Sequence, residues 1–131
     1  MAVGVTTMGL REARAAVEQL PRAVTLALRG VAWQSSRRIQ EDAKRRLRAQ
    51  THGTGKTADA IVVIEEAEEQ QFVIASQGDA GDAANLPLWL EFGTVKMSAR
   101  PYMRPSALAE SDRYRQEMAK ASGDAARDVL Q

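Results

Sequence analysis

Apolar residues in the first part of the chain recur every three or four positions, which is the spacing of an α-helix with one buried face. One such run covers about 8–20, with Thr6 or Thr7 in position to cap it, and Pro21 follows directly. Proline costs about 3 kcal/mol inside a helix but is tolerated in the first turn, so a second helix is predicted over 21–49. Its predicted buried face consists of Val24, Leu28, Val31, Ser35, Ile39, Ala43 and Leu47.

The spacing then changes to short runs of β-branched residues. "AIVVIEE" and "QFVIAS", separated by "AEEQ", predict an antiparallel hairpin over 58–77. Consecutive positions in both runs are apolar, so both faces of the hairpin are predicted to be covered. In so short a chain we expect helices on one face and another subunit on the other.

The last third combines two helices with a proline-containing connection. "LPLWLEFG" predicts a short helix over 86–92, and its final glycine suits the left-handed position that ends many helices. In "TVKMSARPYMRPS" two prolines hold the residues before them extended, and Pro105 fits the first turn of a C-terminal helix over 105–130. The sequence therefore predicts one α+β domain over 1–131, made of a long N-terminal helical segment broken at Pro21, a hairpin, a short helix, an extended segment and a C-terminal helix.

The composition narrows the chemistry that this domain can perform. Of its 131 residues 44% are hydrophobic and 27% are charged, as in ordinary globular proteins, and no apolar run approaches the roughly 20 residues of a membrane span. The chain has no cysteine and a single histidine, His52, so it offers no thiolate ligand, no cysteine nucleophile and no histidine cluster. The acidic run Glu65, Glu66, Glu68 and Glu69 is expected to form an exposed turn. We expect no catalytic residue, no cofactor, no metal and no membrane partner.

The stretch "GTGKT" at 53–57 has the ending of a nucleotide-binding loop. That loop requires a first glycine five positions before its Gly-Lys-Thr, and it lies between a buried strand and a helix. Gln50 occupies the glycine position, and the preceding "RRIQEDAKRRLRAQ" is charged and helix-forming. The sequence therefore predicts no nucleotide site but a turn after the long helix, where Gly53 and Gly55 allow positive φ.

The net charge of +1 conceals a segregation of charge along the chain. Residues 22–48 contain eight Lys and Arg against two acids, whereas residues 57–95 contain eight acids and no Lys or Arg. Copies of the chain, or a charged partner, could use this division for complementary contacts; alternatively both stretches are simply solvated faces. Trp33, which lies off the buried face of its helix, either covers the edge of the core or contacts another subunit.

The run "LWLEFGTVKMSARPYMRPSAL" at 88–108 carries the most specific pattern. It joins Glu-Phe-Gly-Thr, a basic and polar spacer, and Arg-Pro-aromatic-apolar-Arg-Pro. This pattern resembles the neck and tail-completion protein family of long-tailed bacteriophages, small structural proteins of the head–tail junction. The matching residues are Thr54 and Gly55 at the exit of the long helix, and then Glu91, Phe92, Gly93, Thr94, Arg100, Pro101, Tyr102, Met103, Arg104 and Pro105. Thr57, Ala60, Val95 and Ser98 depart from the commoner residues of that family.

The resemblance implies a non-enzymatic virion structural protein. It is expected to form a ring, with a hexamer favoured, at the head–tail junction or tail end and to act in tail completion and head–tail joining. Its expected partners are further copies of itself, neighbouring neck, tail-terminator or tail-tube proteins, and DNA that passes through the channel without sequence-specific binding. The expected location is the virion neck or tail, after assembly in the host cytoplasm.

The residues of the motif are expected to build a scaffold. Gly93 reverses the chain, and Trp89 and Phe92 anchor the short helix. Glu91 accepts a charge-assisted hydrogen bond from Arg100 or Arg104, or these groups make separate surface contacts. The basic residues expected to face another subunit or DNA are Arg37, Arg38, Lys44, Arg45, Arg46 and Arg48. An alternative from a different class is a nucleic-acid-binding module that uses the basic helix 37–48 on phosphates.

Overall fold

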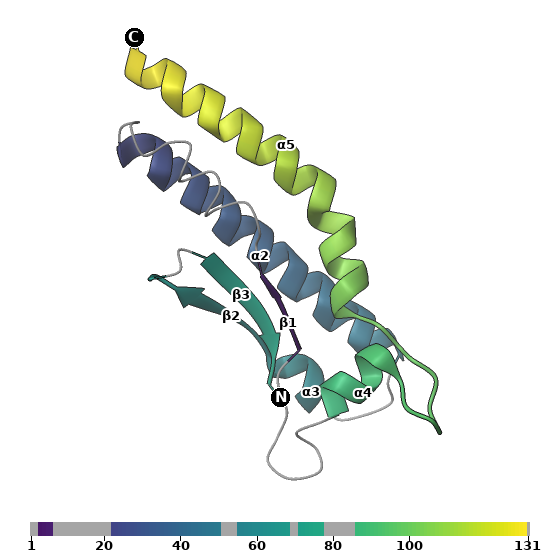
Figure 1. The fold of residues 1–131 in the computed structure, drawn as a ribbon. Helices are drawn as coiled ribbons and strands as arrows, with labels where there is room; N and C mark the ends of the chain where they lie inside the picture. The colour runs from purple at the N-terminus through teal and green to yellow at the C-terminus, as the bar shows by residue number, and fades with distance from the viewer. Residues whose placement is uncertain (1–2, 7–21, 51–54, 69–70, 78–85, 131) are drawn as a thin grey trace.

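A computed structural model describes residues 3–6, 22–50, 55–68, 71–77 and 86–130 of the chain. They form an α+β fold, as the sequence predicts, with long helices, short helices and an antiparallel hairpin (Figure 1). The elements in chain order are β1 (Val3–Thr6), α2 (Arg22–Gln50), α3 (Lys56–Asp59), β2 (Ile61–Glu66), β3 (Gln71–Ser76), α4 (Leu86–Phe92) and α5 (Met103–Leu130).

Helix α2 is the central element of the fold. Figure 1 shows α2 between α5, which runs beside it, and the sheet, which packs against its other side. Helix α2 begins and ends within one residue of the prediction, and six of the seven predicted face residues are buried. Ala32 is fully buried in place of Val31, which is half-buried. The three-to-four spacing therefore located the core face correctly to within one position.

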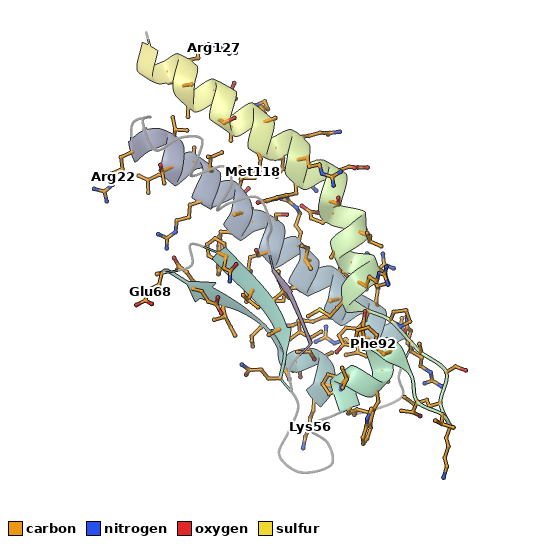
Figure 2. All side chains as sticks on the ribbon, viewed as in Figure 1. Arg22, Lys56, Glu68, Phe92, Met118 and Arg127 are labelled. Carbon is orange, nitrogen blue, oxygen red and sulfur yellow. The ribbon has the colours of Figure 1, made fainter. Side chains whose placement is uncertain are left out.

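The core divides into two clusters along α2. Near the start of the helix, Val24, Leu28 and Ala32 surround Phe72 of the hairpin, and Tyr114 and Met118 of α5 pack against them (Figure 2). Near its end, α2 meets β2, β3, α4 and the start of α5. The buried members of this second cluster are Ile39, Ala43, Leu47, Ala58, Ile61, Ile74, Leu90, Tyr102 and Met103.

The sheet has three antiparallel strands in the order β1-β3-β2. Strand β1 was not predicted, and Thr6, which the sequence offered as a helix cap, pairs with Val73 in this strand. Four residues are too few to show the alternation of apolar and polar positions that marks a strand. Their conformation is decided by pairing with β3, which lies far away in the sequence. The predicted helix over 8–20 and its break at Pro21 lie outside the described residues.

The hairpin itself was predicted correctly, although its strands are shorter than 58–77. Ile61 and Ile74 point toward α2 and are fully buried, whereas Ile64 on the opposite face is 37% exposed. One apolar face of the hairpin is therefore covered by helices. The expectation that another subunit covers the outer face stays a prediction.

Two short helices, α3 and α4, lie at the end of the molecule opposite the α5 C-terminus (Figure 1). Helix α3 is a single turn that was not predicted, and Gly55 precedes it with φ of 81°. Helix α4 has the predicted bounds, and α5 begins at Met103, two residues before the predicted start. Pro105 lies in the first turn of α5, as expected. Gly53, Thr54 and His52 lie outside the described residues.

Trp33 covers an edge of the core. Its ring centroid is 5.5 Å from that of Phe72, and the side chain is 43% exposed. This arrangement agrees with the first of the two readings of Trp33, and contact with another subunit stays a prediction.

Replacing Ile74 with alanine should lower the free energy of unfolding by about 2–5 kcal/mol, because a fully buried side chain leaves a cavity. The matched control is Ile64→Ala on the neighbouring strand, where partial exposure should keep the loss near 1 kcal/mol or less. Urea titration followed by circular dichroism measures both values. Equal losses for the two variants would contradict the assignment of the inner and outer faces.

Candidate functional site

The motif at 88–108 spans most of α4, the first turns of α5 and the rigid connection that joins them, residues 89–100. Helix α4 ends at Phe92, and the following Gly93 has φ of 78° and donates its N–H to the Trp89 carbonyl at 2.7 Å. A Cβ atom at Gly93 would lie 2.8 Å from the Ala99 nitrogen and 2.9 Å from the Met97 oxygen. Both the left-handed conformation and the close backbone approach therefore require glycine here, as the sequence predicted for the conformation.

The residues after Gly93 fold back on α4 through backbone hydrogen bonds. Thr94 and Met97 exchange two such bonds, of 2.8 and 3.3 Å. The Arg100 N–H then donates to the Leu90 carbonyl at 2.6 Å, which returns the chain to the side of α4. The spacer of the motif is thus closed by the Thr94–Met97 bonds, and backbone hydrogen bonds from Gly93 and Arg100 hold its two ends to α4.

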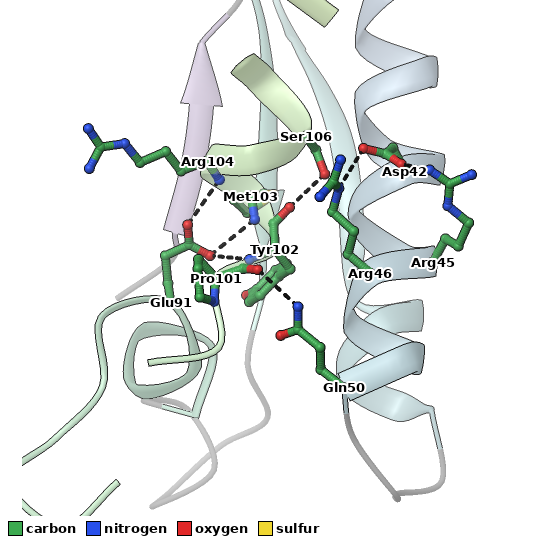
Figure 3. A network of polar contacts seen from close by, with 10 residues as sticks. All are labelled: Asp42, Arg45, Arg46, Gln50, Glu91, Pro101, Tyr102, Met103, Arg104 and Ser106. Carbon is green, nitrogen blue, oxygen red and sulfur yellow. Dashed lines mark hydrogen bonds and ion pairs between the residues drawn. The ribbon is translucent and has the colours of Figure 1, made fainter. Parts of the chain in front are cut away.

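Glu91 fixes the start of α5. Its carboxylate accepts hydrogen bonds from three consecutive backbone N–H groups, those of Tyr102 at 2.9 Å, Met103 at 3.0 Å and Arg104 at 2.9 Å (Figure 3). The first N–H groups of a helix have no partner within the helix, and a negative charge there also interacts favourably with the helix dipole. Glu91, which is only 5% exposed, therefore caps α5 from a different helix.

This geometry corrects the expected partner of Glu91. The sequence suggested a bond from the guanidinium of Arg100 or Arg104, but the donors are backbone groups, and the Arg104 side chain points away from Glu91 (Figure 3). The Arg100 guanidinium donates instead to the Gln50 carbonyl at 3.1 Å, at the end of α2. Gln50 in turn donates to the Pro101 carbonyl at 3.3 Å. Arg100 and Gln50 thus join the motif to α2.

Trp89 and Phe92 do not anchor α4, contrary to the expectation. Phe92 is 68% exposed and Trp89 is 39% exposed, and Val95 beyond the turn is fully exposed. Pro87 and Leu90 hold α4 to the core instead. A helix of two turns has one inward side, and these two residues occupy it, so the aromatic rings point outward. The rigid connection therefore displays three apolar side chains to solvent.

A groove of about 800 Å³ lies between the second half of α2 and the first turns of α5. It contains five of the six basic residues singled out from the sequence, and α5 adds a sixth guanidinium. The arginines of the groove are Arg37, Arg38, Arg45, Arg46, Arg48 and Arg113. The remaining predicted residue, Lys44, is half-buried on α2.

Arg38 occupies the inner wall of this groove. It donates to Glu110 at 2.8 Å and to Glu117 at 2.6 Å, and Ser35 also donates to Glu110 at 2.9 Å. The hydrogen bond to Glu110 is the main cause that raises the pKa of Arg38 above its usual value. Arg38 is therefore an internal tie between α2 and α5, and the expectation that it also faces another subunit or DNA stays a prediction. Glu110 was not predicted from the sequence, although its position one turn before Tyr114 on the buried side of α5 indicated it.

The outer arginines of the groove are more exposed. Arg45 and Arg46 share the carboxylate of Asp42, and Arg48 pairs with Asp59 at 2.7 Å. Burial by itself would raise the pKa of Asp42, but its interactions with Arg46 and other neighbours outweigh burial and lower it. Arg37 donates to the neutral amide of Gln40 at 3.1 Å and lies over the Trp33 ring.

The structure also bears on the "GTGKT" stretch. Lys56 begins a single helical turn that leads into β2, and the element before this stretch is a helix. A phosphate-binding loop has the opposite order, from strand to helix. The described part of the stretch is therefore a connection from helix to strand, as the sequence predicted.

A scan of protein-family models finds no match to this chain, and searches of curated proteins and of solved structures find none either. Among the described residues, no group of three His, Cys, Asp or Glu side chains is placed to hold a metal ion. Within the same residues, no helix has the length and apolar character needed to cross a membrane.

Replacing Glu91 with glutamine should lower the free energy of unfolding by about 1–3 kcal/mol, because an amide loses the charge and turns one donor toward buried N–H groups. The matched control is Glu41→Gln on the exposed side of α2, where the change should stay within about 0.5 kcal/mol. Chemical denaturation of both variants measures the difference. Equal effects would contradict the capping role of Glu91.

Acid should lower the stability of the folded protein through two carboxylates, Glu117 at the contact between α2 and α5 and Asp42 within α2. Hydrogen bonds from Arg113 and Arg38 lower the pKa of Glu117, and the pKa of Asp42 is lowered as well. Carboxyl groups with lowered folded pKa values stabilise the protein above their unfolded pKa and lose this contribution as pH falls through the folded value. The double variant Asp42→Asn, Glu117→Gln should be less stable than wild type at pH 7, by less than about 1 kcal/mol per site. Unfolding measured at intervals below about pH 5 should also show a smaller loss in the variant. An equal loss in both proteins would contradict this prediction.

Proposed function

We propose that this protein is a non-enzymatic structural protein of a bacteriophage-type particle. It acts as a ring-forming component of the head–tail junction or tail end, in tail completion and head–tail joining. The observation that supports this proposal best is the construction of the motif. Glu91, Gly93 and Arg100 hold a short connection rigidly, and that connection exposes the apolar side chains of Trp89, Phe92 and Val95.

Exposed apolar side chains on a rigid segment are suited to contacts between subunits. Large aromatic residues are enriched in protein interfaces, and a fixed segment loses little conformational entropy when it binds. None of the three exposed side chains is needed to complete the described core. The motif that suggested the family is therefore also the part of the chain best built to present an interface.

The partners in this proposal are further copies of the protein, with a hexamer favoured, and adjacent neck, tail-terminator or tail-tube rings. DNA passes through the channel of the ring without sequence-specific binding. The particle's neck or tail is the proposed location, reached after assembly in the host cytoplasm. The alternative of a nucleic-acid-binding module has less support, because Arg38 is consumed by internal ion pairs and three carboxylates line the same groove.

Native mass spectrometry and electron microscopy of the purified protein test this proposal. We expect closed rings of one copy number. A monomer at every accessible concentration, with or without a neighbouring ring protein, would contradict the ring.

The double variant Phe92→Ser, Val95→Ser should remain folded and lose assembly. Both side chains are at least two-thirds exposed, so their loss should change the free energy of unfolding by less than about 1 kcal/mol. The matched control is Leu108→Ser, because Leu108 is 66% exposed but lies on α5 beyond the connection. Sedimentation velocity of the variants should show monomers for the first and wild-type assemblies for the control. Intact assemblies of the double variant would contradict the role of the connection.

A further inference from the structure

Two surfaces of opposite charge lie on different sides of the subunit. One is the groove between α2 and α5, which is lined by six arginines and three carboxylates. The other is the acidic tip, defined as residues 65–68 at the turn of the β2–β3 hairpin. Figure 2 shows Glu68 at this tip, on the side of the molecule away from α5. Within the described residues no ion pair joins the two surfaces of one subunit, because Glu65 of the tip pairs with Arg29, which lies outside the groove.

The outer rim of the groove keeps a small excess of positive charge, because its four arginines outnumber Glu41, Asp42 and the Asp59 partner of Arg48 by one. Arg45 is 77% exposed and shares the single carboxylate of Asp42 with Arg46. Arg37 is exposed, and within the described residues its hydrogen bond goes to a neutral amide, not to a carboxylate. The inner Arg38, by contrast, is paired twice. The rim therefore attracts an acidic group, while the inner wall serves the fold.

The acidic tip has the complementary property. Glu65 is paired with Arg29, and Glu66 accepts a hydrogen bond from the neutral Gln71. Glu68 is exposed and has no ion pair with any residue in the described part of the chain. No Lys or Arg occurs anywhere in 57–95, so the tip keeps a local negative charge.

We propose that the acidic tip of one copy docks against the arginine rim of the groove of the next copy. This inference rests on the proposed function and names the contact by which the ring grows. A contact between two different surfaces is heterologous, and repeating it around a rotation axis closes a ring. Opposite charges at the two surfaces steer the copies into one register.

Charge reversal on each surface tests this contact. The groove variant is Arg37→Glu, Arg45→Glu, and the tip variant is Glu66→Lys, Glu68→Lys. These substitutions leave the ion pairs of Arg38 and Glu65 unchanged. Arg45 gives up its exposed pair with Asp42, which Arg46 retains. Each variant alone places like charges together, so we expect self-association at least about 100-fold weaker than that of wild type. Circular dichroism should show an unchanged fold.

The decisive measurement mixes the two variants. In the mixture, the acidic groove of one variant meets the basic tip of the other, and the basic groove meets the acidic tip. Every contact in an assembly that alternates the two variants is therefore attractive again. We expect assemblies to return in the mixture, and also in the single chain that carries all four substitutions. Sedimentation velocity and native mass spectrometry report both results, and added salt should weaken the restored assemblies.

Three outcomes would overturn the inference. Variants that assemble like wild type would place the ring contact on another surface and leave the proposed function standing. Salt-dependent binding of a DNA duplex, lost in the groove variant and kept in the tip variant, would assign the groove to phosphates. A wild-type protein that never assembles would remove both the contact and the ring.

Discussion

The rest of the structure depends on one buried carboxylate. Glu91 lies on α4, yet its oxygens accept hydrogen bonds from the first N–H groups of α5, which have no backbone partner within that helix. The negative charge of this carboxylate also interacts favourably with the positive end of the α5 dipole. Because α4 is packed into the core through Leu90, the carboxylate fixes where α5 begins and in which direction it runs along α2. One side chain thus links the short helix, the connection and the long helical pair.

The connection around Glu91 is rigid because its backbone is satisfied locally. Gly93 permits a turn that no other residue fits, and Arg100 ties the far end of the connection to the last carbonyl of α2. Rigidity and exposure then occur together, since the same connection presents Phe92 to solvent. A partner that binds there meets a preformed surface, which lowers the entropic cost of association.

Charge serves two purposes in this fold. Between α2 and α5 the network of Arg38, Glu110 and Ser35 is internal and fixes how the two helices face each other. On the outer surface, α2 carries Arg45, which shares the carboxylate of Asp42, and Arg37, which bonds to a neutral amide. The turn of the β2–β3 hairpin carries negative charge. The separation of charge along the sequence therefore becomes a separation between sides of the subunit.

The sequence by itself determined the local elements. Periodicity located α2 and its buried face, β-branched runs located the hairpin, and a terminal glycine located the end of α4, because each of these signals depends on neighbours within a few positions. Tertiary structure decided the rest. The β1 strand exists through pairing with β3, and the Ser35–Glu110 bond joins residues 75 positions apart. The donors to Glu91 and the outward direction of Phe92 were also predicted wrongly, because both depend on which side of a two-turn helix meets the core, and composition and spacing do not encode that choice.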